Sequence, residues 1–369
     1  MGNCRICKTG SPVISSTLGV CLNCIRSKPE EALEITREIH SRSRRSFDLP
    51  EAPPRAAQGL PCGQCANNCC ILEGCKGYCG LVENCQGRLL RHGGTPDKGV
   101  LEWYYDPLPT NCVSWWSCPG CTGVGYPEYT DSAGPEVGYR NLAVFYGSCS
   151  TDCLFCQNWH HRRMAKDTAA SVSAGELATK ATSETSCICF FGGDPSTQMP
   201  HALVTSETIL KGRPKKRNFR ICWETNGRMN PGYLEQAAGL SLRSGGNIKF
   251  DLKTWSPHLH EVLCGTPNRI TLDNFQTTVT KYYAQRPKVP LVTASTLLVP
   301  GYVDVTEIRE ISRFIAELNP SIPYTLLAFY PTYILNDIPA TPKKQAEECY
   351  RTAKKTLKNV RIGNINLLR

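Results

Sequence analysis

Three cysteines in the middle of the chain have the spacing of an iron–sulfur ligand set. Cys149, Cys153 and Cys156 form a C-x3-C-x2-C triplet that directly follows the apolar run 141–146. Three thiolates can hold three irons of a cubane [4Fe–4S] cluster, which leaves the fourth iron open to a substrate or cofactor. The alternative is a zinc site that borrows a fourth cysteine from elsewhere. Because most electron-transfer clusters use four cysteines, the triplet favours an open cluster.

Two further sets of cysteines precede this triplet. The chain has 22 cysteines in 369 residues, and most of them lie in its first half. One set pairs two C-x2-C knuckles and is typical of a structural zinc site; the other has the spacing C-x2-C-x3-C-x9-C and could hold zinc or additional iron in an auxiliary cluster. The first set is Cys4, Cys7, Cys21 and Cys24, and the second is Cys62, Cys65, Cys69 and Cys79. For Cys112, Cys118 and Cys121 the sequence leaves a ligand role open.

Composition and charge indicate a globular enzyme of a reducing compartment. Hydrophobic residues make up 41% of the chain, and the formal net charge is +10. The N-terminus lacks the apolar core of a signal peptide and no run of 18 apolar residues occurs, so we expect a cytoplasmic protein without a membrane span. Clustered C-x2-C pairs then favour metal ligation over disulfides. The basic run 211–220 is predicted to be a solvated loop, and nucleic-acid binding is not expected.

The residues after 140 have the pattern of alternating strands and helices. Such alternation implies parallel βαβ units in an α/β fold. Six units fit, fewer than the eight of a full barrel of ~250 residues, so the sequence predicts a partial (βα)6 TIM-like barrel with its site at the carboxyl ends of the strands. The predicted strands are 141–146, 187–191, 219–223, 247–252, 292–299 and 324–329, and the predicted helices include 174–182, 231–238, 272–283 and 305–318.

The region before the barrel is predicted to be rich in cysteines and loops. We expect a zinc-ribbon-like module plus a helix over 1–45, a Pro-rich linker over 46–61, a cysteine- and aromatic-rich leader over 62–140, and the barrel over 141–369. Within the leader, the tryptophans and tyrosines of 100–135 alternate with Pro and Gly without a helical or strand period. This stretch is predicted to be a long wrapped loop.

The motifs around the triplet resemble those of the radical S-adenosylmethionine (SAM) superfamily. Phe155 stands at the aromatic position near adenine, and the run Gly192-Gly193-Asp194-Pro195 is similar to the GGEP motif that contacts the SAM amino group, with Asp where Glu is usual. The glycine pair would let the backbone approach the ligand closely. The resemblance implies a [4Fe–4S] cluster and SAM as cofactors.

Later motifs resemble those of the glycyl-radical activating enzymes, such as pyruvate formate-lyase activating enzyme. In that group an acidic residue, the adjacent Thr and a later Asp help bind a monovalent cation beside the SAM carboxylate, and Glu224, Thr225 and Asp251 match these positions. The leader around 62–84 is similar to that of AmmeMemoRadiSam-type proteins. Taken together, the resemblance implies these cofactor-binding residues: Phe155, Gly192, Gly193, Asp194, Pro195, Glu224, Thr225, Asn226, Asp251 and Lys253.

Three functions fit these features. The first is hydrogen abstraction from a carbon of a protein or peptide, as post-translational modification or glycyl-radical activation, under anaerobic conditions and with an external reductant such as ferredoxin or flavodoxin. The second is cobalamin-dependent C-methylation of a protein carbon, with the aromatic stretch 100–135 covering the corrin. The third is a non-catalytic iron–sulfur scaffold or nucleic-acid-binding module, which the SAM-type motifs disfavour.

Overall fold

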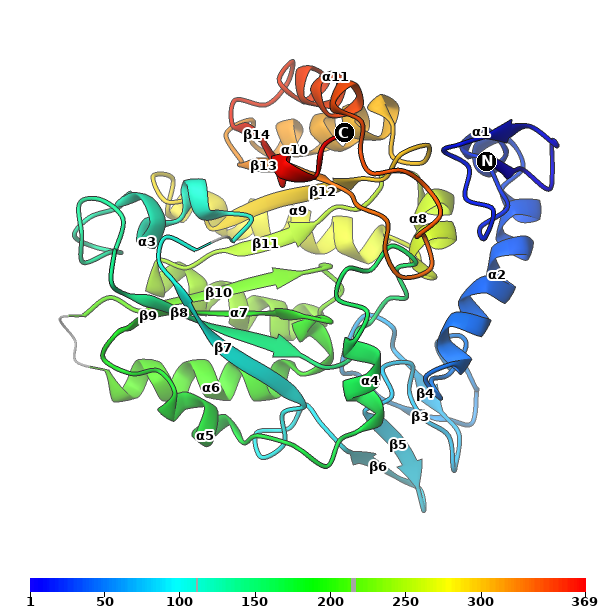
Figure 1. Ribbon diagram of the computed structural model, residues 1–369. Helices are drawn as coiled ribbons and strands as arrows, with labels where there is room; N and C mark the ends of the chain where they lie inside the picture. The colour runs from blue at the N-terminus through cyan, green and yellow to red at the C-terminus, as the bar shows by residue number, and fades with distance from the viewer. Residues whose placement is uncertain (111, 214–216) are drawn as a thin grey trace.

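One eight-stranded sheet organises the molecule (Figure 1). The computed structural model describes residues 1–110, 112–213 and 217–369. The strand order is β14-β13-β12-β11-β10-β9-β8-β7, with β8 to β14 parallel and β7 antiparallel to β8. The strands are β7 (Leu101–Pro107), β8 (Arg140–Tyr146), β9 (Thr185–Gly192), β10 (Arg220–Thr225), β11 (Ile248–Asp251), β12 (Val292–Leu298), β13 (Tyr324–Ala328) and β14 (Val360–Gly363).

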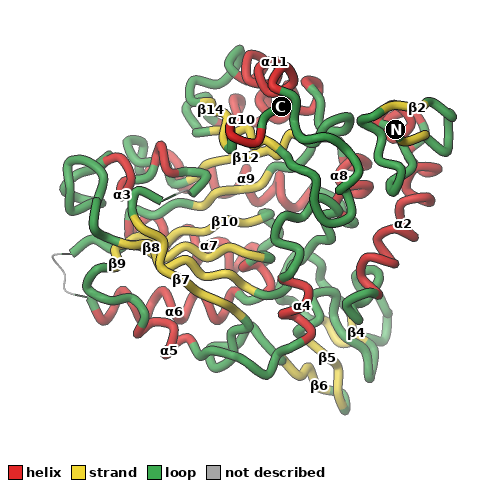
Figure 2. The backbone as a smooth tube through the Cα atoms, viewed as in Figure 1, coloured by secondary structure: helices red, strands yellow, loops and turns green. Residues whose placement is uncertain are grey.

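Helices connect the parallel strands and cover the outer face of the sheet, as Figure 2 shows. Asp304 and Asn230 cap the starts of two of them, α10 and α7, by accepting hydrogen bonds from backbone N–H groups of the first turn. The helices after β8 are α4 (His161–Lys166), α5 (Ala174–Thr179), α6 (Met199–Gly212), α7 (Pro231–Ser244), α8 (Pro257–Cys264), α9 (Arg269–Tyr282), α10 (Val305–Leu318) and α11 (Lys343–Ala353). Short 3-10 turns are η2 (Pro195–Thr197), η3 (Tyr283–Gln285) and η4 (Ile365–Leu367).

The predicted partial barrel is confirmed, with one parallel strand more than expected. All six predicted strands are present as β8 to β13, and β14 extends the sheet beyond them. In the part of the chain that the structure describes, the sheet ends at β7 on one side and at β14 on the other. The division of the chain at 45, 61 and 140 stays a prediction.

The segment expected to be a wrapped loop contains a strand instead. Residues 101–107 form β7, which pairs with the whole length of β8 from Leu101 opposite Tyr146 to Pro107 opposite Arg140. The strand escaped sequence reasoning because Tyr104, an aromatic residue, stands at an exposed position and so breaks the alternation of apolar and polar residues. The following residues form η1 (Trp115–Ser117) and α3 (Pro119–Thr122) at the amino-terminal end of the strands.

The basic run 211–220 is also not entirely a solvated loop. Residues 214–216 lie outside the described part of the chain. At its end, Arg220 starts β10 and is fully buried, with its guanidinium 2.6 Å and 2.9 Å from the carboxylate of Glu136. The ion pair explains how a charged residue can occupy the strand.

The amino-terminal region forms small units along the carboxyl end of the sheet (Figure 1). The helix expected within residues 1–45 is present as two helices, with Pro29 at the first turn of the second. The elements are β1 (Gly2–Asn3), β2 (Gly10–Ser11), α1 (Leu22–Ser27), α2 (Pro29–Arg45), β3 (Leu60–Pro61), β4 (Cys70–Ile71), β5 (Val82–Cys85) and β6 (Arg88–Arg91).

Candidate active site

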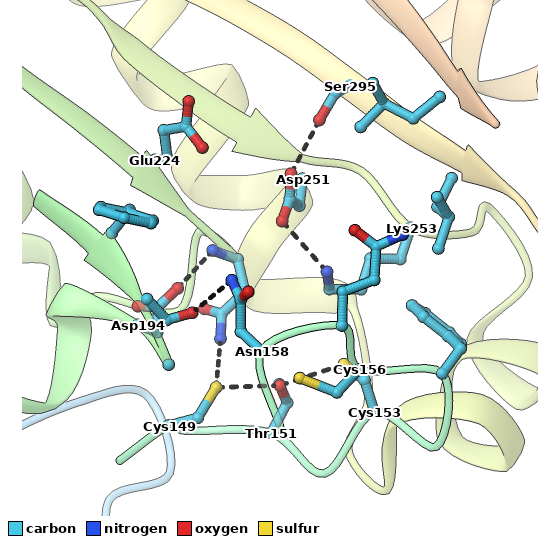
Figure 3. A pocket seen from close by; sticks show the side chains of 18 of the residues that line it. Cys149, Thr151, Cys153, Cys156, Asn158, Asp194, Glu224, Asp251, Lys253 and Ser295 are labelled. Carbon is cyan, nitrogen blue, oxygen red and sulfur yellow. Dashed lines mark hydrogen bonds and ion pairs between the residues drawn. The ribbon is translucent and has the colours of Figure 1, made fainter. Parts of the chain in front are cut away.

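The three cysteines of the triplet line one cavity of about 220 Å³ at the carboxyl ends of the strands. They lie on the loop between β8 and α4, which we name the cluster loop, residues 147–160. The Thr151 hydroxyl is 3.4 Å from the Sγ of both Cys149 and Cys153, so the loop curls its thiols together (Figure 3). Across the cavity, the Asn226 side-chain amide donates to Cys149 Sγ at 3.5 Å.

A buried carboxylate inside the triplet fixes the shape of the cluster loop. Asp152 is fully buried, and its Oδ1 accepts hydrogen bonds from the Arg162 guanidinium at 2.7 Å and 3.1 Å. Burial opposes its ionisation, but Arg162 and His40 outweigh that effect and hold the pKa of Asp152 below its usual range. The loop backbone is also tied to α8, because the Asp152 N–H donates to the Cys264 carbonyl at 2.9 Å.

The glycine pair brings β9 into direct contact with the cluster loop. Gly192 has a φ of +107°, which disfavours any other residue. A Cβ atom on Gly193 would lie 1.8 Å from the carbonyl oxygen of Ser148. The backbone after β9 can therefore approach the loop only because no side chain stands between them.

Asp194 links the ends of β9 and β10. Its Oδ2 accepts from the Asn226 N–H at 2.6 Å, and its carboxylate oxygens accept from the Thr225 hydroxyl at 3.1 Å and 3.2 Å. Burial raises its pKa. Asp194 and Asn226 line the cavity, whereas Thr225 and Pro195 are not among its lining residues.

The opposite wall carries alternating charges. Lys249 Nζ lies 2.8 Å from Asp251 Oδ1 and 3.3 Å from Glu224 Oε2, and Lys253 Nζ lies 3.2 Å from Asp251 Oδ2. Ser295 donates to Asp251 Oδ1 at 2.8 Å. Burial opposes ionisation of Asp251, yet the two ammonium groups hold its pKa below the usual range. Glu224 and Asp251, expected to share a monovalent cation, are thus bridged by the ammonium of Lys249.

Comparison with known proteins decides the family of this domain. Residues 143–315 match the model of the radical SAM superfamily. This region is a radical SAM domain. An uncharacterized protein of Methanocaldococcus jannaschii is 24% identical over 317 residues, which cover 82% of this chain and 81% of that protein. The isethionate sulfite-lyase activating enzyme of Desulfovibrio desulfuricans is 28% identical over 141 residues, which cover 38% of this chain and 40% of that enzyme.

Solved structures with weaker likeness complete the comparison. A domain of pyruvate-formate lyase-activating enzyme from Bacteroides vulgatus aligns with a TM-score of 0.36 and 18% identity, over 48% of this chain and 98% of that one. Streptococcus suis SuiB bound to the precursor peptide SuiA aligns with a TM-score of 0.39 and 14% identity, over 63% and 50%.

The cavity of the radical SAM domain fits the cofactors of that superfamily. Three soft thiols from one loop face it, which suits iron of a cluster with one open position. Phe155 and the glycine pair line the same cavity, as do carboxylates and ammonium groups that can pair with the amino and carboxylate groups of SAM. Of the ten cofactor-binding residues predicted from the sequence, eight line it: Phe155, Gly192, Gly193, Asp194, Glu224, Asn226, Asp251 and Lys253.

Several polar residues that line the radical SAM cavity were not predicted from the sequence, and two of them bear on its charges. Lys249 and Ser295 both line it. Lys249 stands two positions before Asp251 on β11, and alternate residues of a strand face the same side, so the strand period could have found it. Ser295 sits opposite Asp251 on β12, a register that the sequence does not give.

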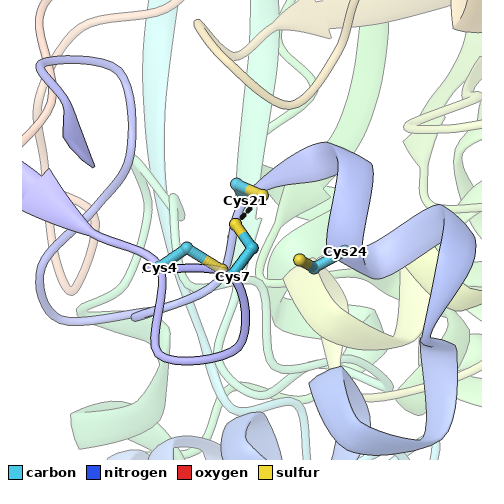
Figure 4. Close-up of side chains that lie close together, drawn as sticks. All are labelled: Cys4, Cys7, Cys21 and Cys24. Carbon is cyan, nitrogen blue, oxygen red and sulfur yellow. Dashed lines mark hydrogen bonds between the residues drawn. The ribbon is translucent and has the colours of Figure 1, made fainter. Parts of the chain in front are cut away.

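The cysteine set at the amino terminus is a compact group of four thiols (Figure 4). The Sγ atoms of its four cysteines lie within 4.8 Å of one another, and no other group of three or more metal-ligand side chains in the described ranges does so. Cys7 Sγ is 3.7 Å from Cys21 Sγ. Four thiolates at about 2.3 Å from a tetrahedral zinc would be separated by roughly 3.8 Å. The group is Cys4, Cys7, Cys21 and Cys24.

The second cysteine set is looser and lies beside the cluster loop. We name it the second leader site; its members are Cys62, Cys65, Cys69 and Cys79. Cys62 Sγ accepts from the Arg91 guanidinium at 3.9 Å, and Cys69 Sγ accepts from the Tyr78 N–H at 3.5 Å. The Cys79 carbonyl accepts from the Ser148 hydroxyl at 2.7 Å, so this site touches the residue before Cys149. Cys65, another member of this set, is buried.

Three residues of the leader after β7 contact side chains of β10, β12 and β13. Cys112 Sγ donates to Glu224 Oε1 at 3.3 Å, Ser114 pairs with Thr293 at 2.7 Å, and Trp116 donates to Thr325. Trp116 of the aromatic stretch 100–135 is thereby packed against the sheet. Separately, none of the described helices combines the length and apolar character that a bilayer crossing requires.

Proposed function

We propose that this protein is a radical SAM enzyme that abstracts a hydrogen atom from a carbon of a protein or peptide substrate. The observation that carries the proposal is the single cavity in which the triplet faces the Gly193–Asp194 turn and the Lys249–Asp251–Lys253 wall. A [4Fe–4S] cluster with bound SAM would supply the electron that cleaves SAM and yields a 5′-deoxyadenosyl radical. The chain is 28% identical over 141 residues to the isethionate sulfite-lyase activating enzyme, whose name states action on another enzyme. This likeness supports a protein substrate.

The residues of the cavity have separate tasks in this proposal. Cys149, Cys153 and Cys156 hold the cluster. The carboxylate of Asp194, with its bonds to Thr225 and Asn226, fixes the turn that receives the SAM amino group. Lys253 pairs with the SAM carboxylate, and Phe155 packs on the adenine.

Lys249 takes the role that a monovalent cation has in the activating enzymes. Its ammonium already bridges Glu224 and Asp251, the two carboxylates expected to bind such an ion. The third expected ligand, Thr225, is bonded to Asp194 instead. A fixed ammonium would hold the same charge at this point without an exchangeable ion.

Both cysteine sets that precede the barrel are proposed to bind metals. The four-thiol group at Cys4, Cys7, Cys21 and Cys24 would hold zinc, because its spacing matches a tetrahedral thiolate site. The site at Cys62, Cys65, Cys69 and Cys79 would hold zinc or an additional iron–sulfur cluster. An external one-electron donor such as ferredoxin or flavodoxin would reduce the main cluster in an anaerobic cytoplasm.

A hydrogen-transfer assay tests the substrate class. The reconstituted enzyme, SAM and dithionite are mixed with a deuterated cell extract of the native host, separated by size into macromolecules and small molecules. We expect deuterium in 5′-deoxyadenosine only from the macromolecular fraction, and its loss after proteolysis of that fraction. Transfer from the small-molecule fraction alone, unchanged after proteolysis of that fraction, would contradict a protein or peptide substrate. The alternative, cobalamin-dependent methylation, would instead require bound cobalt and yield S-adenosylhomocysteine as a second product.

A further inference from the structure

The amino-terminal four-thiol module is firmly docked on the barrel. Arg26, two residues after Cys24, makes two parallel hydrogen bonds to the carboxylate of Asp304 at 2.8 Å and 2.9 Å. The Tyr302 hydroxyl accepts from the Ser15 N–H at 3.0 Å and donates to the Val20 carbonyl at 3.1 Å. The loop that leads into Cys21 and helix α1, which carries Cys24, are therefore held beside the start of α10.

Helix α2 extends from this module to the cluster loop. It begins at Pro29, five residues after Cys24, and Figure 1 shows it running along the carboxyl end of the sheet to the leader. Its last turns are buried on one face, where His40, Ser43 and Arg44 point inward. The Arg44 guanidinium stacks on the Tyr78 ring, 3.4 Å from its centroid, next to Cys79 of the second leader site.

The buried face of α2 holds the carboxylate that shapes the cluster loop. His40 Nδ1 lies 2.9 Å from Asp152 Oδ2, and the Ser43 hydroxyl donates to Asp152 Oδ1 at 3.2 Å. The other ring nitrogen of His40 lies 3.1 Å from the Val262 carbonyl in α8. Asp152 stands directly before Cys153, so a shift of α2 would move a thiol of the triplet.

We propose that a zinc ion in the four-thiol module fixes α2 and, through His40 and Ser43, controls how firmly the cluster loop keeps its cluster. His40 and Ser43 act as positioning residues, because they contact Asp152 and not the cysteines. The metal completes a module of only two short strands and one helical turn, which is too small to bury a core of its own. The inference rests on the proposed cluster at Cys149, Cys153 and Cys156.

The coupling is tested by metal content and cluster retention rather than by turnover. We would prepare the full chain, its C7S variant and a C85S control anaerobically, reconstitute each, and measure zinc, iron and the electron paramagnetic resonance of the reduced cluster. Both cysteines are exposed, so neither substitution opens a core cavity. Cluster loss to a chelator is then followed by visible absorbance. We expect C7S to lose the zinc of this site and to release its cluster about tenfold faster than C85S, the scale seen when residues behind metal ligands are changed.

A second set of variants separates the helix contact from the folding of the module. H40A and S43A should keep the zinc yet release the cluster faster, whereas H40N, whose amide can still reach Asp152, should restore most of the retention. H92A, which removes a histidine paired with Glu83 on the β5–β6 hairpin, should behave as the full chain does.

Each failure has its own meaning. Zinc retained by C7S, or iron in place of zinc at this site, would overturn the metal assignment. Loss of zinc with unchanged cluster release, or H40A indistinguishable from H92A, would overturn the coupling. Absence of a cluster from the full chain itself would instead refute the proposed function on which the coupling rests.

Discussion

Lys249 is the residue that most distinguishes this cavity from its expected form. Its ammonium lies between two carboxylates and is itself buried, and Asp251 and Glu224 raise its pKa despite that burial. A charge built into β11 cannot exchange with solvent ions. The cavity should therefore work equally well in sodium and potassium.

Removal of this ammonium should create a dependence on monovalent cations. K249A leaves Glu224 and Asp251 facing each other without a counter-charge and opens room for an ion. We expect SAM affinity to fall about 10- to 100-fold, as when a hydrogen bond to a charged group worth about 1.5–3 kcal/mol is lost, with partial recovery in high potassium or sodium. Equilibrium binding of SAM across salts of equal ionic strength measures both effects. A cation dependence of the unsubstituted protein, equal to that of K249A, would contradict the assigned role.

A single methyl group at Gly193 should prevent cluster assembly. The Cβ of G193A would overlap the Ser148 carbonyl at 1.8 Å, so the cluster loop would have to move away from β9. We expect loss of most iron after reconstitution and a lower melting temperature. G175A is the matched control, because a Cβ at Gly175 in α5 meets no atom within 4 Å. Full iron content in G193A would show that the close approach is not needed.

A residue of the site could be predicted from the sequence when the motif that marks it lies within a short stretch of the chain. The triplet, the glycine pair and the Glu224–Asn226 run are local motifs, and the structure brings them together at one cavity. Lys249 required the strand period of β11 to be applied two residues back from Asp251. The pairing of His40 with Asp152 spans 112 positions, and no local pattern encodes such a contact.

At the scale of elements, strands with buried faces were predictable and those with a solvated or irregular edge were not. The runs that became β8 to β13 are almost wholly buried, as expected for parallel strands covered on both faces. β7 and β14 are edge strands with mostly half-buried or exposed residues, so their sequences resemble loops. Arg220 lies in both the predicted strand 219–223 and the basic run 211–220, and it is buried in β10 because Glu136, a partner 84 positions away, neutralises its charge.

The Arg220–Glu136 pair should make β10 sensitive to acid. Burial opposes ionisation of Glu136, but Arg220 outweighs it and lowers the pKa of Glu136 to about 2 from an ordinary 4.5. Because the folded-state pKa is depressed, the pair stabilises the fold fully above about pH 4.5, and this contribution is lost as the pH falls toward 2.

Substitution of Glu136 should expose that contribution. E136Q leaves a buried guanidinium without its counter-charge, and removing one partner of a buried pair typically costs about 3–5 kcal/mol in the free energy of unfolding. Denaturant unfolding at neutral pH measures the loss, and the difference from the unsubstituted chain should shrink between pH 4.5 and 2. E207Q, which breaks an exposed pair with Arg243, should change stability little. Equal effects of the two substitutions would refute the account of the strand.

The whole molecule consists of a partial barrel and an amino-terminal region that contacts the cluster loop. Besides the ends of β9 and β10, three other segments contact the cluster loop: α2 through Asp152, α8 through its backbone carbonyls, and the second leader site through Ser148. Composition and cysteine spacing predicted metal sites in this region, but only the folded chain shows that α2 and the second leader site contact the cluster loop. The sheet also ends at β7 and β14 without mutual pairing in the described residues, which leaves the barrel open on one side.

Reductive cleavage of SAM by the anaerobically reconstituted chain tests the central claim most directly. Iron, sulfide and 5′-deoxyadenosine would be measured with dithionite as the electron donor, for the full chain and for the C153S and C85S variants. We predict about four irons in the main site and 5′-deoxyadenosine from the full chain and from C85S, with both lost in C153S. A full cluster that produces no 5′-deoxyadenosine, even with host extract as a source of substrate, would contradict the assignment of this cavity to radical SAM chemistry.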